Sequence, residues 1–478
     1  MSAQPGAGVE VFAAVDIGAS SGRVVAGWFD EVGPHLDIVH RFPNGPTMID
    51  GALRWKVTEL YEQVLVGLGR LAERYDRVRS IGIDTWAVDY GLLDDHGQLI
   101  AEPTSYRDDR TGPAIAEVDA LVSRERQYAV NGLQHLPFTT LYQLRAERHS
   151  DQWSRVRHAL LLPDLIGYWL SGVARTEITN ASTTGLLDAT ARTWSAELLA
   201  ALDLPLDLFA PLVEPGTALG PISAAVAERT GLSSGTTVVA VGSHDTASAV
   251  VGVPATEHDF AYVSSGTWSL VGLELPAPVQ SDAGRDANFT NEGGVDGKIR
   301  FLRNVGGLWL FSESLRTWAA SGEPSDADAL LAAAAQLPAG GPTVDIDAEE
   351  FIAPGDMPSR IQAACERAGG LVPRTPVEIV RCVLDSLAVA YAKTLEQART
   401  LAERDVTVVH IVGGGSQNAL LCSLTAELTG LPVLAGPVEA TALGNLAVQA
   451  RAAGVLPATL EELRAALAAH LELTLYTP

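Results

Sequence analysis

Two segments with the same unusual pattern constrain the fold of this 478-residue chain. The first is VDIGASSGRVV, residues 15–25, and the second is FAYVSSGTWSLVGLEL, residues 260–275. In each, two short runs of β-branched and aromatic residues flank a turn of glycine and small or hydroxylated residues, which predicts a β-hairpin. Such a turn leaves backbone N–H groups open to an anion, so each hairpin predicts a phosphate site.

The separation of the two hairpins indicates a duplicated architecture. The second begins about 245 residues after the first, close to half of the chain, and nothing recurs at the shorter periods of solenoids, about 20–50 residues. A chain of this length also exceeds the usual size of one hydrophobic core. We therefore expect two domains, 1–250 and 251–478, that pack on each other, hinge, and hold a ligand in the cleft between them.

The order of elements in the first half disfavours a dinucleotide-binding domain. The patterns predict strands at 11–15, 24–28 and 37–42, a helix at 57–75, and a turn at 94–97 within the next strand-like segment. A Rossmann domain needs a helix directly after its glycine loop, and here a strand follows instead.

Net charge and cysteine spacing disfavour several classes of protein. The net charge of -25 disfavours binding to nucleic acid or to an anionic membrane, and we expect neither as a partner. Cys365, Cys382 and Cys422 form no CxxC pair, so we expect free thiols and a cytoplasmic protein. The N-terminus lacks a secretory pattern, and no uncharged apolar run reaches about 18 residues.

Asp16 ends the leading strand of the first hairpin, just before the glycine turn. A carboxylate beside a phosphate site suggests a bridging cation, which makes Asp16 a candidate Mg²⁺ ligand. The alternative is that Asp16 caps the turn through its own backbone.

VVAVGSHDTASAV, residues 238–250, predicts a buried strand that delivers Ser243, His244, Asp245 and Thr246 to a strand-to-helix junction. Reactive groups of α/β sheets lie at such carboxyl ends, and Asp245 could accept a proton from a hydroxyl that attacks phosphorus. Alternatively, Asp245 is a helix N-cap and His244 a buried structural histidine.

VTVVHIVGGGSQNALL, residues 406–421, predicts a strand, a triple-glycine turn and a helix. Three glycines allow a base or ribose to lie against the backbone, and the helix N-terminus favours negative charge. A purely structural loop is the alternative. We expect GPVEATALGN, residues 436–445, to support the same pocket or the hinge.

Motifs along nearly the whole chain, from about residue 11 to 475, resemble those of the FGGY carbohydrate kinases, and their order is more specific than any single motif. They are VDIGASSGR, SIGIDTWAVDYGLLD, YRDDRT, GLQHLPFTTLYQL, LLPDLIGYWLSG, TNASTTGLLD, SHDTASAV, YVSSGTWSLVG, NEGG, LRNVGGLWL, IVGGGSQNALL and GPVEATALGN.

The resemblance implies an α/β fold of two actin-like, RNase H-like domains around a cleft, with sugar bound to the first and ATP to the second. It makes Asp245 the catalytic base, and we expect Mg²⁺ at Asp16 and Asp245. The implied sugar contacts are Ala87, His244, Thr246 and Asn304. The implied ATP contacts are Ala19, Ser20, Ser21, Gly22, Arg23, Thr267, Ser312 and Gly414.

Three departures from the family pattern concern the ligand contacts. Some relatives have Gly where this chain has Ala87, which changes the floor of the sugar site by a methyl group. Relatives place a Gln near ATP where this chain has Ser312, which puts that contact in doubt. Other members have a Trp-x-Asp-x-Arg segment where this chain has Tyr106, Asp108 and Arg110, which indicates a sugar other than xylulose or glycerol.

We therefore expect an ATP-dependent ketose kinase that phosphorylates L-rhamnulose at O1 in L-rhamnose degradation, as a monomer or homodimer. Fuculose, xylulose, ribulose and glycerol are the alternative substrates. A noncatalytic actin-like sensor or chaperone-type ATPase is disfavoured, because a sensor need not keep Asp16 and Asp245 and a chaperone needs a further domain.

Overall fold

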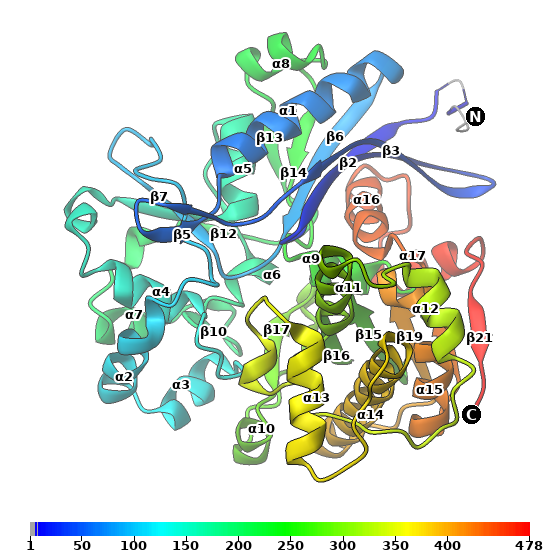
Figure 1. Cartoon of the computed structure of the whole chain (residues 1–478). Coiled ribbons are helices and arrows are strands. Elements are labelled where there is room, and N and C mark those ends of the chain that lie inside the picture. Colours follow the sequence, from blue (N-terminus) through cyan, green and yellow to red (C-terminus); the bar gives the residue numbers. More distant parts are fainter. Residues whose placement is uncertain (1–4, 7) are drawn as a thin grey trace. The chain divides into compact units, whose positions relative to one another are not determined.

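The computed structural model describes residues 5–6 and 8–478, which form two compact units built from interleaved segments (Figure 1). Unit 1 contains the described residues up to Thr256, together with Glu274–Phe301 and Ala440–Leu471. Unit 2 contains Glu257–Leu273, Leu302–Glu439 and Glu472–Pro478. The chain thus leaves unit 1 close to the boundary expected at residue 250 and then returns to it twice.

Unit 1 is organised around a six-stranded mixed sheet with the order β13-β14-β6-β1-β2-β3 (Figure 1). The strands β1, β2 and β3 are antiparallel, whereas β1, β6 and β14 run parallel to one another. The bounds are β1 Val11–Ile17, β2 Ser21–Asp30, β3 Gly33–Pro43, β6 Val78–Thr85, β13 Ala218–Pro221 and β14 Thr237–Val239. The predicted first hairpin and third strand are confirmed.

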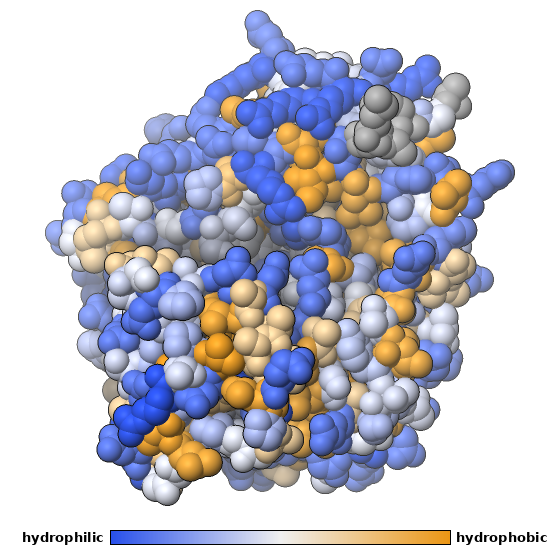
Figure 2. All heavy atoms as spheres, turned by 45° about the vertical axis from the view of Figure 1, so that its right-hand side comes forward, coloured by the Kyte–Doolittle hydropathy of each residue, from blue (hydrophilic) through white to orange (hydrophobic). Residues whose placement is uncertain are grey.

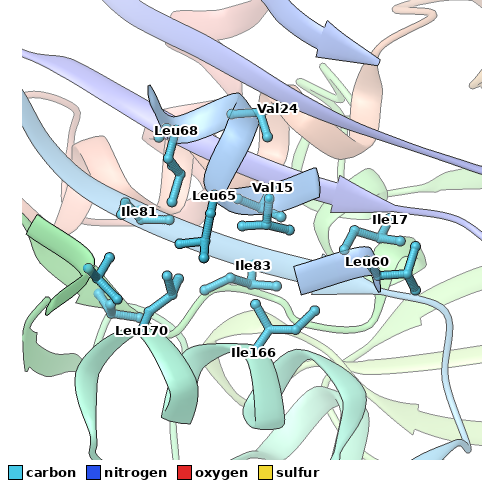
Figure 3. Close-up of a cluster of buried hydrophobic side chains, with 14 of the residues drawn as sticks. Val15, Ile17, Val24, Leu60, Leu65, Leu68, Ile81, Ile83, Ile166 and Leu170 are labelled. Atoms are coloured by element: carbon cyan, nitrogen blue, oxygen red, sulfur yellow. The ribbon is translucent and has the colours of Figure 1, made fainter. Parts of the chain in front are cut away.

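Strand β1 is buried along its whole length because helices cover both faces of the sheet. Alternate residues of a strand point to opposite faces. Val15 and Ile17 pack in the cluster beneath α1 (Val57–Arg74) and α5 (Leu162–Ser171), as Figure 3 shows. Phe12 and Ala14 pack instead with residues of α16 (Ala440–Ala452).

Short elements complete unit 1 between and after the sheet strands. These are β4 Thr47–Ile49, β5 Ala52–Arg54, β7 Tyr90–Leu93, α2 Thr111–Leu121, α3 Arg124–Asn131, α4 Thr140–Glu147, β8 His158–Leu161, β9 Thr176–Glu177, α6 Ile178–Ala181, β10 Leu187–Asp188, β11 Thr193–Trp194, α7 Ala196–Ala201, β12 Leu212–Val213, α8 Ala224–Thr230, α9 Asp245–Val251, α10 Asp282–Asp286, β17 Thr290–Gly293 and α17 Leu460–Ala468. The helix predicted at 57–75 and the turn at 94–97 are confirmed.

Unit 2 has its own sheet, whose order from β18 is β18-β16-β15-β19-β20-β21. Its predicted hairpin is confirmed, because β15 and β16 pair antiparallel, and β15 pairs parallel with β19. The strands are β15 Phe260–Ser265, β16 Trp268–Leu275, β18 Ile299–Gly306, β19 Val408–Val412, β20 Val433–Ala435 and β21 Thr474–Tyr476. The helices are α11 Trp309–Ser321, α12 Ala327–Ala334, α13 Met357–Arg367, α14 Pro376–Ala402 and α15 Ala419–Thr429.

The surface agrees with the acidic net charge of the chain. On the face shown in Figure 2, hydrophilic residues are widespread and apolar residues lie in patches between them. Among residues 5–6 and 8–478, no helix is both long enough and apolar enough to span a bilayer. Cys365, Cys382 and Cys422 are all buried and free, as expected.

Candidate active site

The turn of the first hairpin is short and tightly closed. The N–H of Gly18 donates to the carbonyl of Ser21 at 2.9 Å, and the side chain of Asn44 donates to the carbonyl of Gly18 at 2.8 Å. Gly22 has no room for a side chain, because a Cβ atom would lie 2.3 Å from the ring of Phe42. Ser20 and Ser21 are exposed, so hydroxyl and backbone groups of this turn face solvent.

Three charged residues lie in a row across neighbouring strands at this end of the sheet. Asp16 is the register partner of Arg23 on β2 and of Asp84 on β6, which places all three side chains on one face. Arg23 donates to Oδ2 of Asp16 from Nε at 2.9 Å and from Nη2 at 2.7 Å. The carboxylate of Asp16 therefore pairs with an arginine instead of capping the turn.

The segment Ser243–Thr246 reaches the same end of the sheet. The N–H of Thr85 donates to the carbonyl of Ser243 at 2.9 Å, which continues the sheet beyond β6 and β14. Glu177 holds Ser243 from the other side, accepting from its backbone N–H at 3.1 Å and its hydroxyl at 2.7 Å. His244 is the N-cap residue of α9 but makes no capping hydrogen bond, and Asp245 is the first helical residue.

Burial and like charge set the ionisation of these carboxyl groups. The pKa of Asp84 is raised by burial and by the charges of Asp16 and Asp245, although Asn445 donates to Oδ2 of Asp84 at 2.6 Å. The pKa of Asp245 is raised by burial and by Asp16, against the opposing effect of His244. Oδ1 of Asp84 is buried without a hydrogen-bond partner. The charge of Asp16 thus acts on both of the other carboxyl groups.

The loop after β6 carries Ala87 and is rigidly braced. Val88 has a left-handed backbone with φ 67°, a strained conformation for a β-branched residue. Its carbonyl accepts from the hydroxyl of Thr140 at 2.7 Å. The buried carboxylate of Asp89 accepts from the indole N–H groups of Trp55 at 2.5 Å and Trp86 at 2.9 Å. The backbone beside Ala87 is therefore fixed on both sides.

In unit 2, the turn of the second hairpin supports the start of α11. The carbonyl of Thr267 accepts from the N–H of Trp309 at 3.2 Å. Gly307 allows this close packing, since a Cβ atom there would lie 2.5 Å from the carbonyl oxygen of Thr267. Asn304 lies on β18 and is partly buried, whereas Ser312, on the first turn of α11, is exposed.

The triple-glycine turn lies against the end of β15. Gly413 has φ 80°, and a Cβ atom there would lie 2.9 Å from the carbonyl oxygen of Ser265. A Cβ atom at Gly415 would lie 2.0 Å from the hydroxyl of Ser265. At Gly414, in contrast, a Cβ atom would meet nothing within 4 Å, so this residue presents open backbone.

The structure groups the predicted site residues within each unit. Asp16, residues 19–23, Ala87 and residues 244–246 all lie at one end of the unit 1 sheet. Thr267 and Gly414 lie on turns at the ends of β15 and β19, which are adjacent parallel strands.

Sequence reasoning missed Asp84, Glu177, Glu292 and Arg300. Asp84 had a readable signal: like Asp16, it lies near the carboxyl end of an apolar strand, in SIGIDTW. The other three approach the Ser243–Asp245 segment from β9, β17 and β18, and only the tertiary structure reveals this.

No group of three or more His, Cys, Asp or Glu side chains able to hold a metal ion is found across residues 5–6 and 8–478. The Mg²⁺ that kinases use is commonly held by one or two carboxylates together with substrate phosphates and water. The carboxyl groups of Asp16, Asp84 and Asp245, with the unpartnered Oδ1 of Asp84 among them, match that smaller requirement.

Comparison with known proteins gives consistent matches over most of the chain. The N-terminal domain of the FGGY family of carbohydrate kinases matches residues 11–252, and its C-terminal domain matches residues 261–453. A curated rhamnulokinase of Klebsiella pneumoniae is 42% identical over 470 residues, covering 97% of this chain and 94% of the relative. A rhamnulokinase of Enterococcus faecalis is 42% identical over 448 residues, covering 93% and 90%.

Solved structures show the same fold at low sequence identity. A ligand-bound xylulose kinase from Lactobacillus acidophilus has a TM-score of 0.79 and 17% identity, covering 98% of this chain and 94% of the other. The expected α/β fold of two actin-like domains is thereby confirmed.

Proposed function

This chain belongs to the FGGY family of carbohydrate kinases and is an ATP-dependent sugar kinase, and we propose that it phosphorylates L-rhamnulose at O1 to give L-rhamnulose 1-phosphate and ADP. The observation that carries the choice of sugar is the 42% identity to rhamnulokinases over 97% of the chain. The solved structures, at 17% identity or similar, support only the fold.

Asp245 is the proposed general base. Its carboxylate accepts the proton of the sugar hydroxyl as that oxygen attacks the γ-phosphorus and the bond to ADP breaks. A base works best when its pKa approaches the working pH, and burial raises the pKa of Asp245 in that direction. The position of Asp245, at the start of α9 and after the anchored Ser243, supports this role.

The proposed sugar contacts combine fixed backbone with polar side chains. Ala87 lies on the braced loop, and His244 and Thr246 flank the base. The hydroxyl of Thr246 donates to Oδ1 of Asp245 at 3.1 Å, which orients that carboxylate. Asn304 is the proposed contact from unit 2.

The proposed nucleotide contacts use both hairpin turns. Residues 19–23 and Thr267 are assigned to the phosphates, and Gly414 to the adenosine, where its open backbone leaves room for a flat group. Ser312 is exposed on α11 and is assigned here as a weaker contact than the Gln of relatives.

Asp16 and Asp245 would hold Mg²⁺ together with the phosphates, and Asp84, whose pKa is raised by burial and by the charges of both residues, lies beside them. When bound, the ion neutralises charge on the β- and γ-phosphates. We further propose that the enzyme works in the cytoplasm as a monomer or homodimer.

A coupled assay of ADP release with ATP and Mg²⁺ across L-rhamnulose, fuculose, xylulose, ribulose and glycerol tests the substrate. We expect the highest kcat/KM for L-rhamnulose. A clear preference for another of these sugars would contradict the assignment while leaving the kinase chemistry intact.

The role of the base is tested with Asp245→Asn. We expect kcat to fall by about 10²–10⁴, the usual contribution of a positioned general base. ATP binding, measured by calorimetry, should persist, because the nucleotide contacts are unchanged. Normal turnover by this variant would show that another group takes the proton.

A further inference from the structure

A buried arginine–glutamate pair lies against the imidazole of His244. Nη2 of Arg300 lies 3.0 Å from Nδ1 of His244 and 3.1 Å from Oε2 of Glu292. Arg300 is 0% exposed, and its Nε donates to the carbonyl of Gly293 at 3.0 Å. On the other side of the ring, Nε2 lies 3.4 Å from Oδ1 of Asp245. The imidazole is therefore held between a guanidinium and the proposed base.

These contacts bear on which ring nitrogen carries the proton. Nδ1 faces both Arg300, which can only donate, and Oε2 of Glu292 at 3.2 Å, which can only accept. The contact with Arg300 has hydrogen-bond geometry, whereas the contact with Oε2 of Glu292 is at ion-pair distance only. A nitrogen that accepts from a guanidinium carries no proton, so the proton of a neutral ring belongs on Nε2.

A proton on Nε2 would also point toward the carboxylate of Asp245, whose Oδ1 lies 3.4 Å away. An Nε2–H group faces the carboxylate of Asp245 as a donor, whereas the other tautomer would turn a lone pair toward that carboxylate. The remaining charges near this segment are Asp16 with its partner Arg23, Asp84, and Glu177, which binds Ser243. Within the described part of the chain, the hydrogen bonds of Asp16, Asp84 and Glu177 join them to Arg23, Asn445 and Ser243 and not to the ring of His244.

We propose that Arg300 and Glu292 are positioning residues that hold His244 in the Nε2–H tautomer, so that its single N–H points toward Asp245 and is shared with an oxygen atom of the sugar. Arg300 sets the tautomer directly. Glu292 compensates the buried guanidinium, which would be costly to bury alone. This inference rests on the proposed roles of His244 and Asp245 in sugar phosphorylation.

The ionisation of Glu292 agrees with its proposed role as the counter-charge of Arg300. Burial raises the pKa of its carboxyl group, the positive charge of Arg300 opposes that effect, and the net pKa is lowered. Glu292 is therefore a carboxylate that can balance Arg300.

Nitrogen NMR of protein labelled with ¹⁵N-histidine tests the tautomer directly. The chain contains 10 histidines, and the resonances of His244 are assigned by their loss in His244→Asn. We expect the wild type to show a protonated Nε2 and an unprotonated Nδ1. Arg300→Met should shift the ring toward Nδ1 protonation, with Glu292 as the new acceptor, whereas Glu292→Gln should leave Nε2 protonated.

Two NMR results would overturn the proposal. One is a wild-type His244 protonated at Nδ1, whether neutral or doubly protonated. The other is the reverse pattern in the variants, a tautomer that changes in Glu292→Gln but not in Arg300→Met, which would assign control to the glutamate. Because this NMR measurement needs no turnover, its result does not depend on which sugar the enzyme phosphorylates.

Kinetics separate a positioning role from a general loss of stability. We expect Arg300→Met to reduce kcat/KM for the preferred sugar by about 10–100-fold, the range seen when partners that orient an imidazole ligand are removed. KM for ATP should change by less than about twofold. Arg300→Lys, which keeps the charge but loses the planar fork, should recover part of the loss.

Arg464→Met provides a matched control. Arg464 is also buried, pairs with Glu274 at 2.7 and 2.8 Å, and donates to the carbonyl of Val250 in the last turn of α9, away from His244 at its start. We expect Arg464→Met to lower the midpoint of thermal unfolding, as Arg300→Met does, and to leave the tautomer of His244 unchanged. Equal losses of kcat/KM in both variants would reduce Arg300 to a structural role.

Discussion

At the scale of single residues, the most constrained side chain near the proposed sugar site is Asp89. Its carboxylate accepts from Trp55, Trp86 and the side chain of Gln143, the last at 3.0 Å. Burial nevertheless raises the pKa of Asp89 to about 6, against the lowering effect of these hydrogen bonds. The folded protein therefore protonates this group at a higher pH than the unfolded chain does.

The sign of the resulting pH dependence follows from linkage. The stability associated with the raised pKa of Asp89 is fully present below the unfolded value near 4 and is lost as pH rises to about 6. We expect the advantage of wild type over Asp89→Asn in free energy of unfolding to shrink between pH 4 and pH 7, by at most about 3 kcal/mol. Urea denaturation at both pH values measures it. A constant difference would show that Asp89 has no raised pKa.

The site residues that could be predicted from the sequence are those with a recognisable turn or strand next to them. Asp16 was found because a glycine turn follows it, and Asp245 because a buried strand ends just before it. Asp84 was missed because no turn follows it directly, although its register with Asp16 puts both on one face. The partners of His244 could not be predicted, because Glu292 and Arg300 lie some 50 residues further along the chain.

At the scale of elements, the position of α9, which begins with the proposed base, depends on close packing against α16. A Cβ atom at Gly444 would lie 1.8 Å from the carbonyl oxygen of Ser248, so the two backbones touch. Gly252, just after α9, is equally restricted, since a Cβ atom there would lie 2.4 Å from the carbonyl oxygen of Ala440. Small residues at this contact therefore fix the position of α9, which begins with Asp245.

Gly444→Ala should consequently push α9 away from α16. We expect the free energy of unfolding to fall by about 1–3 kcal/mol, the usual cost of overpacking, and kcat to fall as well. Gly112→Ala in α2 is the control, because a Cβ atom there meets nothing within 4 Å and alanine favours a helix. Chemical denaturation of both variants compares them; equal stability would mean that the helices separate without cost.

The elements that could be predicted are those with strong local patterns. Both hairpins and the helix α1 followed from alternating or periodic apolar residues. Two-residue strands such as β9 and β12 carry no such pattern, because their pairing with each other depends on the surrounding fold. Yet β9 supplies Glu177, which anchors Ser243 before the proposed base.

At the scale of the whole molecule, each unit is built from segments that lie far apart in the sequence. A division of the sequence at one boundary could not predict this arrangement. Residues 440–471 return to unit 1, where Ala442, Leu446 and Ala450 of α16 cover Phe12 and Val25. Gln449 joins the same core by donating to the carbonyl of Ala13 at 2.9 Å. Nothing in the local pattern of GPVEATALGN indicates which sheet its helix will cover.

This interleaving predicts which elements unfold together when the protein partially unfolds. Because α16 completes the core of β1 and β2, its amides should exchange with those strands as one cooperative unit, although they lie more than 400 residues apart. Its neighbour in sequence, α15, packs on α14 and should exchange with unit 2. Native-state hydrogen exchange of the full chain at increasing denaturant measures this. If α16 opened together with α15 and independently of β1, the folding units would follow the sequence instead of the packing.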